Sequence, residues 1–181
     1  MYHDLNLYIR GDWRPASDKA TKPVTDPATE DALGLIAVAT EADVDDALAA
    51  AKEGFQVWKR TGTWERAAKI RKVADLIRER TDDIATLMSL ETGKPLAEAK
   101  GETGAAADHF EWFSEETKRI YGQTIESRTV DSRMAVIYQP VGVVAAFSAW
   151  NFPALLPARK IAAALAAGCS IIVKPAGETP A

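Results

Sequence analysis

The chain has 181 residues and a net charge of −4, and 47% of its residues are hydrophobic. This composition excludes a disordered chain, and the length fits one domain, or one domain with an appended element, that buries a core of its own. The charge balance argues against a nucleic-acid or anionic-membrane partner, and the longest apolar run, 161–173, is too short to span a bilayer.

The sequence contains a single cysteine, Cys169, which excludes an internal disulfide. Its first residues, Met1–Asp4, lack the basic start and apolar core of a secretion signal. Both features are typical of a protein of the reducing cytoplasm, and we expect the chain to act there.

Extended structure is predicted before residue 40. Leu5–Ile9 alternates as a strand does and precedes a turn at Gly11–Asp12. Residues 15–29 are polar, contain three prolines and are predicted to form an extended arm. A second short strand is predicted at Leu33–Val38.

Helical segments follow. Thr40 begins the sequence Thr-Glu-Ala-Asp, a capping box in which Asp43 replaces the usual glutamate or glutamine. The helix that it opens extends to Trp58 on a stripe of apolar residues at helical spacing. Further helices are predicted to begin at Thr63, Thr81 and Leu96, the last of them reaching Tyr121.

Residues 124–139 alternate between apolar and polar character. The apolar positions are Ile125, Val130, Met134, Val136 and Tyr138. This pattern is typical of an antiparallel hairpin or β-ribbon.

Residues 140–181 predict one β-α-β unit. Val141–Phe147 is a nearly unbroken apolar run, typical of a strand buried on both faces, and Ser170–Lys174 is a second such strand. Between them, Pro153–Ala167 has the apolar spacing of a helix, and Gly168 follows it as a C-terminal cap glycine does. Elements of these lengths favour two parallel strands joined by a right-handed crossover.

A binding edge is predicted within this unit. Ligands in open α/β sheets bind beyond the carboxyl ends of the strands. Phe147–Asn151 and Lys174–Thr179 follow those ends, so the two segments are predicted to lie together at the edge where a ligand binds.

These segments resemble the cofactor-domain signature of the aldehyde dehydrogenase superfamily, and other motifs of that family occur in order along most of the chain. The resemblance is carried by Asp26–Thr29, Glu91–Pro95, Tyr138–Val143, Trp150–Pro153, Lys160, Ala163–Gly168, Lys174–Ala176 and Thr179–Pro180. Within the superfamily, the chain resembles the succinate-semialdehyde dehydrogenase-like branch most.

The resemblance implies an α/β fold, namely the N-terminal portion of a Rossmann-type cofactor domain with a projecting β-ribbon. It divides the chain into an N-terminal arm with a helical part (1–121), the ribbon (122–139) and the incomplete start of a dinucleotide-binding sheet (140–181). Because such a ribbon takes part in subunit assembly in the family, a homo-oligomer, either a dimer or a tetramer, is expected for the complete protein.

Asn151 has two interpretations. From the residues alone it is favoured as the N-cap of the following helix, because asparagine is a preferred cap and Pro153 follows closely. The resemblance implies instead that its amide stabilises the negative charge on the substrate oxygen during aldehyde oxidation. Both roles are compatible, since a cap position would fix the amide.

The resemblance implies that five other residues contact the cofactor: Phe147, Ser148, Trp150, Lys174 and Gly177. A lysine at the end of a buried strand can donate to ribose hydroxyls or a phosphate, but strand-end charges are also common without a ligand. For Phe147, Ser148 and Trp150 the alternative is core packing and a turn, and for Phe147 the two interpretations weigh equally.

Gly177 stands where many NAD-preferring relatives carry a glutamate that binds the adenine ribose. In this sequence the carboxylate, Glu178, comes one residue later. A carboxylate at the 2′-hydroxyl would repel the extra phosphate of NADP. Its loss implies a site that accepts NADP at least as well as NAD.

Other residues that could carry chemistry have simpler interpretations. Cys169 is predicted to be a small buried residue, because it lies between Gly168 and a buried strand without a neighbouring histidine or carboxylate motif. His3 and His109 are isolated, so no metal site is predicted. Solvated helix faces are predicted for Glu91, Glu102 and Glu111.

The resemblance implies NAD(P)-dependent oxidation of a small aldehyde to a carboxylate through a cysteine nucleophile and a glutamate base. The sequence contains no motif for either group. We therefore expect the N-terminal part of an aldehyde dehydrogenase, or a truncated product, that is inactive alone. The alternative is a non-catalytic dinucleotide-binding or assembly module.

Overall fold

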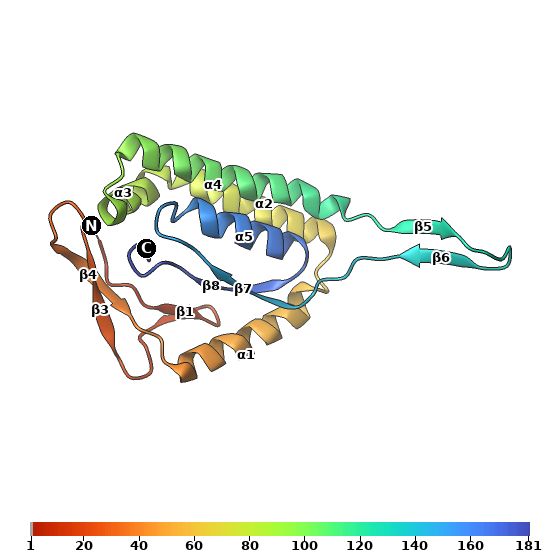
Figure 1. Ribbon diagram of the computed structural model, residues 1–181, viewed down its shortest axis with the longest axis horizontal. Coiled ribbons are helices and arrows are strands. Elements are labelled where there is room, and N and C mark those ends of the chain that lie inside the picture. Colours follow the sequence, from red (N-terminus) through yellow and green to blue (C-terminus); the bar gives the residue numbers. More distant parts are fainter. Residues whose placement is uncertain (1) are drawn as a thin grey trace.

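The structure is a computed structural model that describes residues 2–181. Hairpins and helices precede a projecting ribbon, and a β-α-β unit follows it (Figure 1). The elements in chain order are β1 (Leu7–Ile9), β2 (Asp12–Arg14), β3 (Thr21–Thr25), β4 (Ala32–Ala37), α1 (Glu41–Trp58), α2 (Thr63–Glu79), α3 (Thr81–Thr92), α4 (Leu96–Glu116), η1 (Thr117–Arg119), β5 (Gln123–Glu126), β6 (Arg133–Val136), β7 (Val143–Phe147), α5 (Leu155–Ala166) and β8 (Ser170–Lys174).

The main body is layered. Helices α2, α3 and α4 form one layer, α5 packs beneath them, and the two-stranded sheet β7–β8 lies between α5 and α1 (Figure 1). The core between α2, α4 and α5 consists of Ile70, Ala74, Ala106, Phe110, Ala158, Ala162 and Ala166. Because most of these side chains are methyl groups, the helix axes can approach closely, and Phe110 supplies the bulk that fills the space.

The predicted β-α-β unit is confirmed. Strands β7 and β8 pair in parallel, and α5 connects them. Gly168 follows the end of this helix, and its φ of +86° is the left-handed conformation that glycine adopts without a side-chain clash. The expectation that both strands are buried is wrong, because the sheet has only two strands within residues 2–181. Ala145 and Phe147 of β7 are exposed, and β8 is half-buried up to the exposed Lys174.

Helix α1 is held against the sheet by two bonds to backbone carbonyls. The Trp58 indole donates to the carbonyl of Leu165 at 2.9 Å, and the Ser170 hydroxyl donates to the carbonyl of Ala51 at 2.7 Å. Both bonds join residues more than a hundred positions apart in the sequence. They fix α1 to the far side of β8 from α5.

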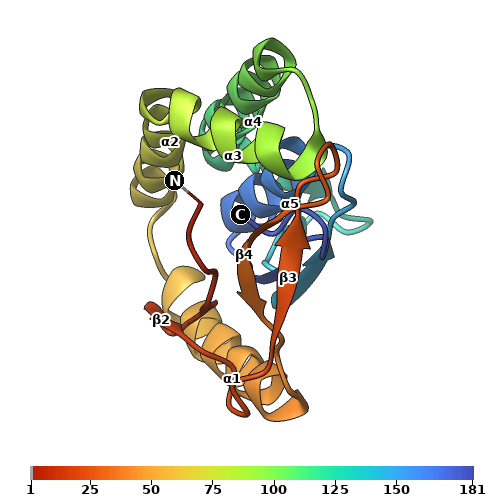
Figure 2. The same cartoon turned by 90° about the vertical axis from the view of Figure 1, so that its left-hand side faces the viewer.

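The extended arm predicted over residues 15–29 contains the strand β3, which the prolines in this stretch argue against. Strand β3 pairs antiparallel with β4, and Pro23 lies within it opposite Leu35. A proline is tolerated there because β3 has a free edge in this two-stranded sheet. The β3–β4 hairpin lies at the end of the body opposite the ribbon (Figures 1 and 2).

The projecting ribbon is confirmed. Strands β5 and β6 pair antiparallel and extend away from the body (Figure 1). Every residue in both strands is exposed, including the apolar Ile125, Met134 and Val136. The ribbon therefore has no core of its own in this chain.

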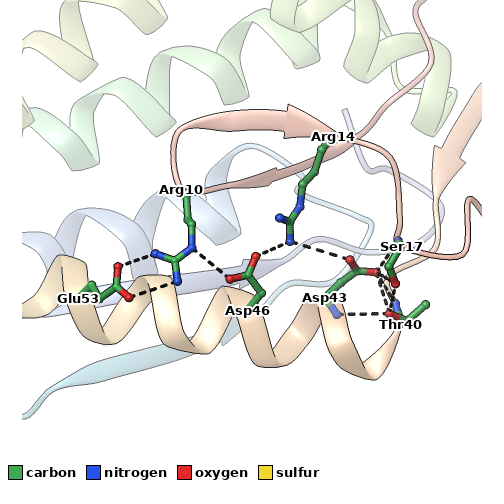
Figure 3. Close-up of polar contacts among 7 residues, drawn as sticks. All are labelled: Arg10, Arg14, Ser17, Thr40, Asp43, Asp46 and Glu53. Carbon is green, nitrogen blue, oxygen red and sulfur yellow. Dashed lines mark hydrogen bonds and ion pairs between the residues drawn. The ribbon is translucent and has the colours of Figure 1, made fainter.

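Charged side chains attach the β1–β2 hairpin to α1 (Figure 3). Arg10 contacts Asp46 at 3.1 Å and also pairs with Glu53, while Arg14 contacts Asp46 at 2.6 Å. These pairs are partly exposed, so each contributes little alone, but together they set the position of the hairpin along the helix.

The capping box predicted at Thr40 is confirmed. Its hydroxyl accepts a bond from the Asp43 amide, and Asp43 Oδ2 accepts from the Thr40 amide at 2.9 Å and the Ser17 amide at 3.1 Å. These bonds, led by those from the two backbone amides, lower the pKa of Asp43 to about 2. Asp43 therefore joins the start of α1 to the chain after β2.

We expect Asp43→Asn to destabilise the fold at neutral pH. A carboxyl whose pKa falls on folding stabilises the native state above its ordinary pKa of about 3.9, and it loses that contribution as the pH falls toward about 2. Asparagine retains an acceptor oxygen but not the charge. The midpoint of thermal unfolding should fall by a few degrees at neutral pH, and the gap to the parent should close between about pH 4 and pH 2.

The matched control for this prediction is Asp45→Asn, an exposed position on the same helix turn. Equal losses for the two variants, or a gap that stays constant down to low pH, would contradict the role assigned to Asp43.

Candidate functional site

The register of the parallel pair brings the two predicted binding segments together. Phe147 at the end of β7 lies opposite Lys174 at the end of β8. The ladder continues for one more bond, because the Ser148 amide donates to the Lys174 carbonyl at 3.3 Å. The segments that follow the two strands therefore leave the sheet at the same carboxyl edge, as predicted.

Large side chains at this edge are open to solvent. Phe147 is 69% exposed and Trp150 is 57% exposed, so the core-packing interpretation is wrong for both. Ser148 is half-buried and Lys174 is exposed. Two exposed aromatic side chains and an ammonium group beside one strand end are features of a ligand-binding edge.

Asn151 is not the N-cap of α5, and the capping interpretation is wrong. The helix begins at Leu155, its N-cap position is Ala154, and no side-chain hydrogen bond is formed from that position. Within residues 2–181 the Asn151 side chain forms no hydrogen bond, and the residue is exposed. Its amide is therefore available to a ligand at this edge.

The start of α5 is bound by a residue from another helix. Glu102 of α4 accepts hydrogen bonds at Oε1 from the amides of Ala154 at 3.0 Å and Leu155 at 3.1 Å. Its second oxygen pairs with the ammonium of Lys94. The same ammonium donates to the Asn151 carbonyl at 3.0 Å and lies 4.5 Å from the centroid of the Phe152 ring.

Solvated faces were expected for Glu91, Glu102 and Glu111, and this is wrong for two of them. Glu91 is 4% exposed and Glu102 is 6% exposed, while Glu111 pairs near the surface with Arg71 and Arg78. The spacing of apolar residues along α4 does indicate that Glu102 is buried. It follows Ala99 by three positions and precedes Ala106 by four, on the apolar stripe of α4.

Glu91 forms a separate buried contact. It accepts a bond from the Tyr2 hydroxyl at 2.6 Å and from the Ala181 amide at 3.0 Å. Burial raises the pKa of this carboxyl. Glu91 therefore links the N-terminal segment, the end of α3 and the segment after β8.

Gly177 lies beside Lys22, which no local sequence pattern connects to this edge. A Cβ atom added at Gly177 would stand 2.5 Å from the Nζ atom of Lys22. Lys22 belongs to β3, within the stretch expected to be an arm, which is why its proximity could not be foreseen. A second ammonium thus stands near the segment that follows Lys174.

Cys169 is buried, as predicted, with 3% exposure. Its amide donates to the Ala164 carbonyl at 2.9 Å, which closes the end of α5. Across residues 2–181, no three histidine, cysteine or acidic side chains gather as metal ligands do, and no helix is both long and apolar enough to cross a membrane.

The sequence pattern described as the Aldehyde dehydrogenase family matches residues 13–181, and the chain belongs to this family. It is 47% identical to the glutarate-semialdehyde dehydrogenase of Pseudomonas putida, over 96% of this chain and 36% of that protein. It is 45% identical to the NADP(+)-linked succinate-semialdehyde dehydrogenase of Escherichia coli, over 98% of this chain and 38% of that protein.

The fold agrees with this assignment. A crystal structure of an NADP-dependent enzyme from E. coli superimposes with a TM-score of 0.96 at 45% identity, over 98% of this chain and 37% of the other. The predicted fold class, an N-terminal portion of an aldehyde-dehydrogenase-like cofactor domain, is thereby confirmed. The chain spans little more than a third of the length of these relatives.

We expect Cys169→Ala in the complete protein to retain activity. The thiol is buried and precedes β8 at the opposite end of that strand from Lys174, so the change should lower the free energy of unfolding by only about 1 kcal/mol. Steady-state rates and thermal unfolding are the measurements. A folded but inactive variant would contradict the structural role of Cys169.

Proposed function

We propose that the complete protein oxidises a small aldehyde to a carboxylate with NAD or NADP as hydride acceptor, and that this chain supplies the oxyanion-stabilising amide and part of the cofactor site. The observation that carries the proposal is the exposed carboxyl edge. At this edge the chain, which belongs to the aldehyde dehydrogenase family, carries the exposed Asn151 amide close to the ends of β7 and β8 at Phe147 and Lys174. The proposal rests on residues 2–181 and on the family, since the chain spans only part of its relatives.

In this reaction Asn151 would have one role, which is to stabilise the negative charge that develops on the substrate oxygen. A cysteine thiolate, which we assign to the remainder of the protein, attacks the aldehyde carbon, and the carbonyl π electrons become an alkoxide. The Asn151 amide would donate to that oxygen and stabilise its charge. A nicotinamide cofactor bound at this edge would supply the acceptor for the hydride that the alkoxide loses. Water would then hydrolyse the resulting thioester to the carboxylate and regenerate the thiolate with release of protons.

The cofactor would be held along the same edge. Lys174 would donate to an adenosine ribose or phosphate oxygen, and Ser148 with the two exposed aromatic residues, Phe147 and Trp150, would line the groove. Support for NADP comes from Gly177, which offers no carboxylate to its 2′-phosphate, and from the Lys22 ammonium beside it. We infer that NADP is accepted at least as well as NAD.

The substrate class is inferred from the relatives. Two of them are named for succinate and glutarate semialdehydes, short aldehydes that carry a second, charged end. We propose a small aldehyde of this class as the substrate. The alternative function, a non-catalytic dinucleotide-binding or assembly module, remains an outcome of the experiments below.

The ribbon supports the proposal of a homo-oligomer, a dimer or a tetramer. Residues 122–139 would be the assembly element, residues 1–121 the supporting helical part and residues 140–181 the start of the cofactor sheet. Apolar side chains on and beside the ribbon are exposed, namely Ile125, Val130, Met134, Val136, Ile137 and Tyr138. Exposed apolar surface of this extent is a mark of a protein interface.

We expect Asn151→Ala in the complete protein to lower kcat by roughly 100- to 1,000-fold, because one donor to the developing oxyanion is lost. The aldehyde KM and the affinity for NADPH should change far less. The measurements are steady-state oxidation of a semialdehyde and fluorescence titration with NADPH. The control is Asn6→Ala, at the only other asparagine of the chain, which is also exposed.

An unaltered kcat in Asn151→Ala would contradict the oxyanion role. Cofactor binding without aldehyde-dependent reduction in the parent protein would favour the non-catalytic module. Residues 1–181 alone should fail to oxidise aldehydes, because no nucleophile is assigned within them.

We expect Gly177→Glu to reverse the cofactor preference. The new carboxylate would stand beside Lys22 and repel the 2′-phosphate, so kcat/KM for NADP should fall relative to that for NAD by roughly tenfold or more. Lys22→Ala should weaken NADP binding in particular, while Lys52→Ala, an exposed lysine of α1, serves as the control. Tighter binding of NAD than of NADP by the parent protein, by several-fold, would contradict the inferred tolerance.

A further inference from the structure

The Lys94–Glu102 pair holds the segment that carries Asn151 from two sides. Lys94 binds the Asn151 carbonyl at 3.0 Å, and Glu102 binds the amides of Ala154 and Leu155 at 3.0 and 3.1 Å. We propose that Lys94 and Glu102 are positioning residues that fix the Asn151 amide for catalysis. This inference rests on the proposed function, because it assigns to the pair the orientation of that same amide.

Lys94 itself is held by its own turn. Gly93 adopts a φ of +70° at the end of α3, which turns the chain toward α4. The Ser89 hydroxyl donates to the Lys94 carbonyl at 2.6 Å, and the Lys94 amide donates to the Thr92 hydroxyl at 3.1 Å. Because the carbonyl and the amide of Lys94 are both hydrogen-bonded, the backbone from which the ammonium extends is held in place.

Both carboxylate oxygens of Glu102 are engaged at this site. One carboxylate oxygen accepts both amides at the start of α5, and the other faces the Lys94 ammonium. The Glu102 side chain is 2% exposed and the Lys94 side chain is 14% exposed. A carboxylate buried to this extent requires both its cation and its amide donors, so the geometry of the three groups is coupled.

Asn151 receives its position through its backbone alone. The Lys94 ammonium donates to the Asn151 carbonyl, and the Phe152 ring lies against the same ammonium. Further along the segment, Glu102 accepts hydrogen bonds from the amides of Ala154 and Leu155. Nothing within residues 2–181 engages the Asn151 side chain. The Lys94–Glu102 pair therefore restrains the backbone of this segment and leaves the Asn151 side-chain amide free to donate to a substrate oxygen.

Two substitutions in the complete protein separate positioning from folding. Lys94→Met removes the ammonium and leaves a buried carboxylate, so both stability and kcat should fall, with kcat lower by roughly 10- to 100-fold. Glu102→Gln keeps an acceptor for the two amides but loses the anionic partner of Lys94. In the double variant Lys94→Met/Glu102→Gln no buried charge remains, so the midpoint of thermal unfolding should recover.

The double variant distinguishes positioning from stability, because both buried charges are removed but the Asn151 carbonyl still lacks the Lys94 ammonium. We expect its kcat to stay at least about tenfold below the parent, while the aldehyde KM and NADPH affinity change less than threefold. Recovery of kcat together with stability would overturn the proposal and leave the pair a purely structural one. The control is Lys100→Met, which breaks an exposed ion pair between α4, the helix of Glu102, and Asp82 of α3, and which should alter neither kcat nor stability.

A double-mutant cycle with Asn151→Ala keeps the two claims apart. If Lys94 acts through Asn151, Lys94→Met should reduce kcat by less than about threefold in the Asn151→Ala background. A full, multiplicative loss in that background would overturn the positioning role while the oxyanion role stands. An Asn151→Ala variant with normal kcat would overturn the proposed function itself, whatever Lys94→Met does.

Discussion

The arrangement of the candidate site depends on the burial of one carboxylate. Glu102 lies on the face of α4 that packs against α5, where an unpaired charge would be strongly destabilising. It is compensated by the Lys94 ammonium and by two amides at the start of α5. Lys94 lies in the turn just before α4, and the two amides lie in the segment after β7, so folding brings the start of α5 to Glu102, which is 52 positions away in the sequence. The Asn151 segment lies at this contact.

The second constraint is the parallel register of β7 and β8. It sets Phe147 opposite Lys174 and delivers both following segments to one edge of the sheet. Helix α5 supplies the crossover, and its alanine-rich face allows it to sit close to α2 and α4. The same close packing carries Glu102 within reach of the first amides of α5. Helix packing and site geometry are thus consequences of the same small side chains.

Much of the fold followed from local patterns, but the partners of buried charges did not. The β-α-β unit, the capping box at Thr40 and the ribbon each have a signature within a short stretch of sequence. Strand β3 was missed because Pro23 argues locally against a strand, and only its partner β4 makes the pairing possible. Glu102 was assigned to a solvated face because its charge outweighed its place on the apolar stripe. The three groups that compensate its charge lie 8, 52 and 53 positions away, and no local pattern predicts that they meet.

The most direct test of this account is a crystal structure of the complete protein with its nicotinamide cofactor and an aldehyde held as the thiohemiacetal. The account predicts that the Asn151 amide nitrogen lies about 2.7–3.1 Å from the substrate oxygen. It also predicts that Lys94 still binds the Asn151 carbonyl and that Glu102 still binds the amides of Ala154 and Leu155. An Asn151 amide turned away from the substrate oxygen, or a Lys94 ammonium that has left the Asn151 carbonyl, would contradict it.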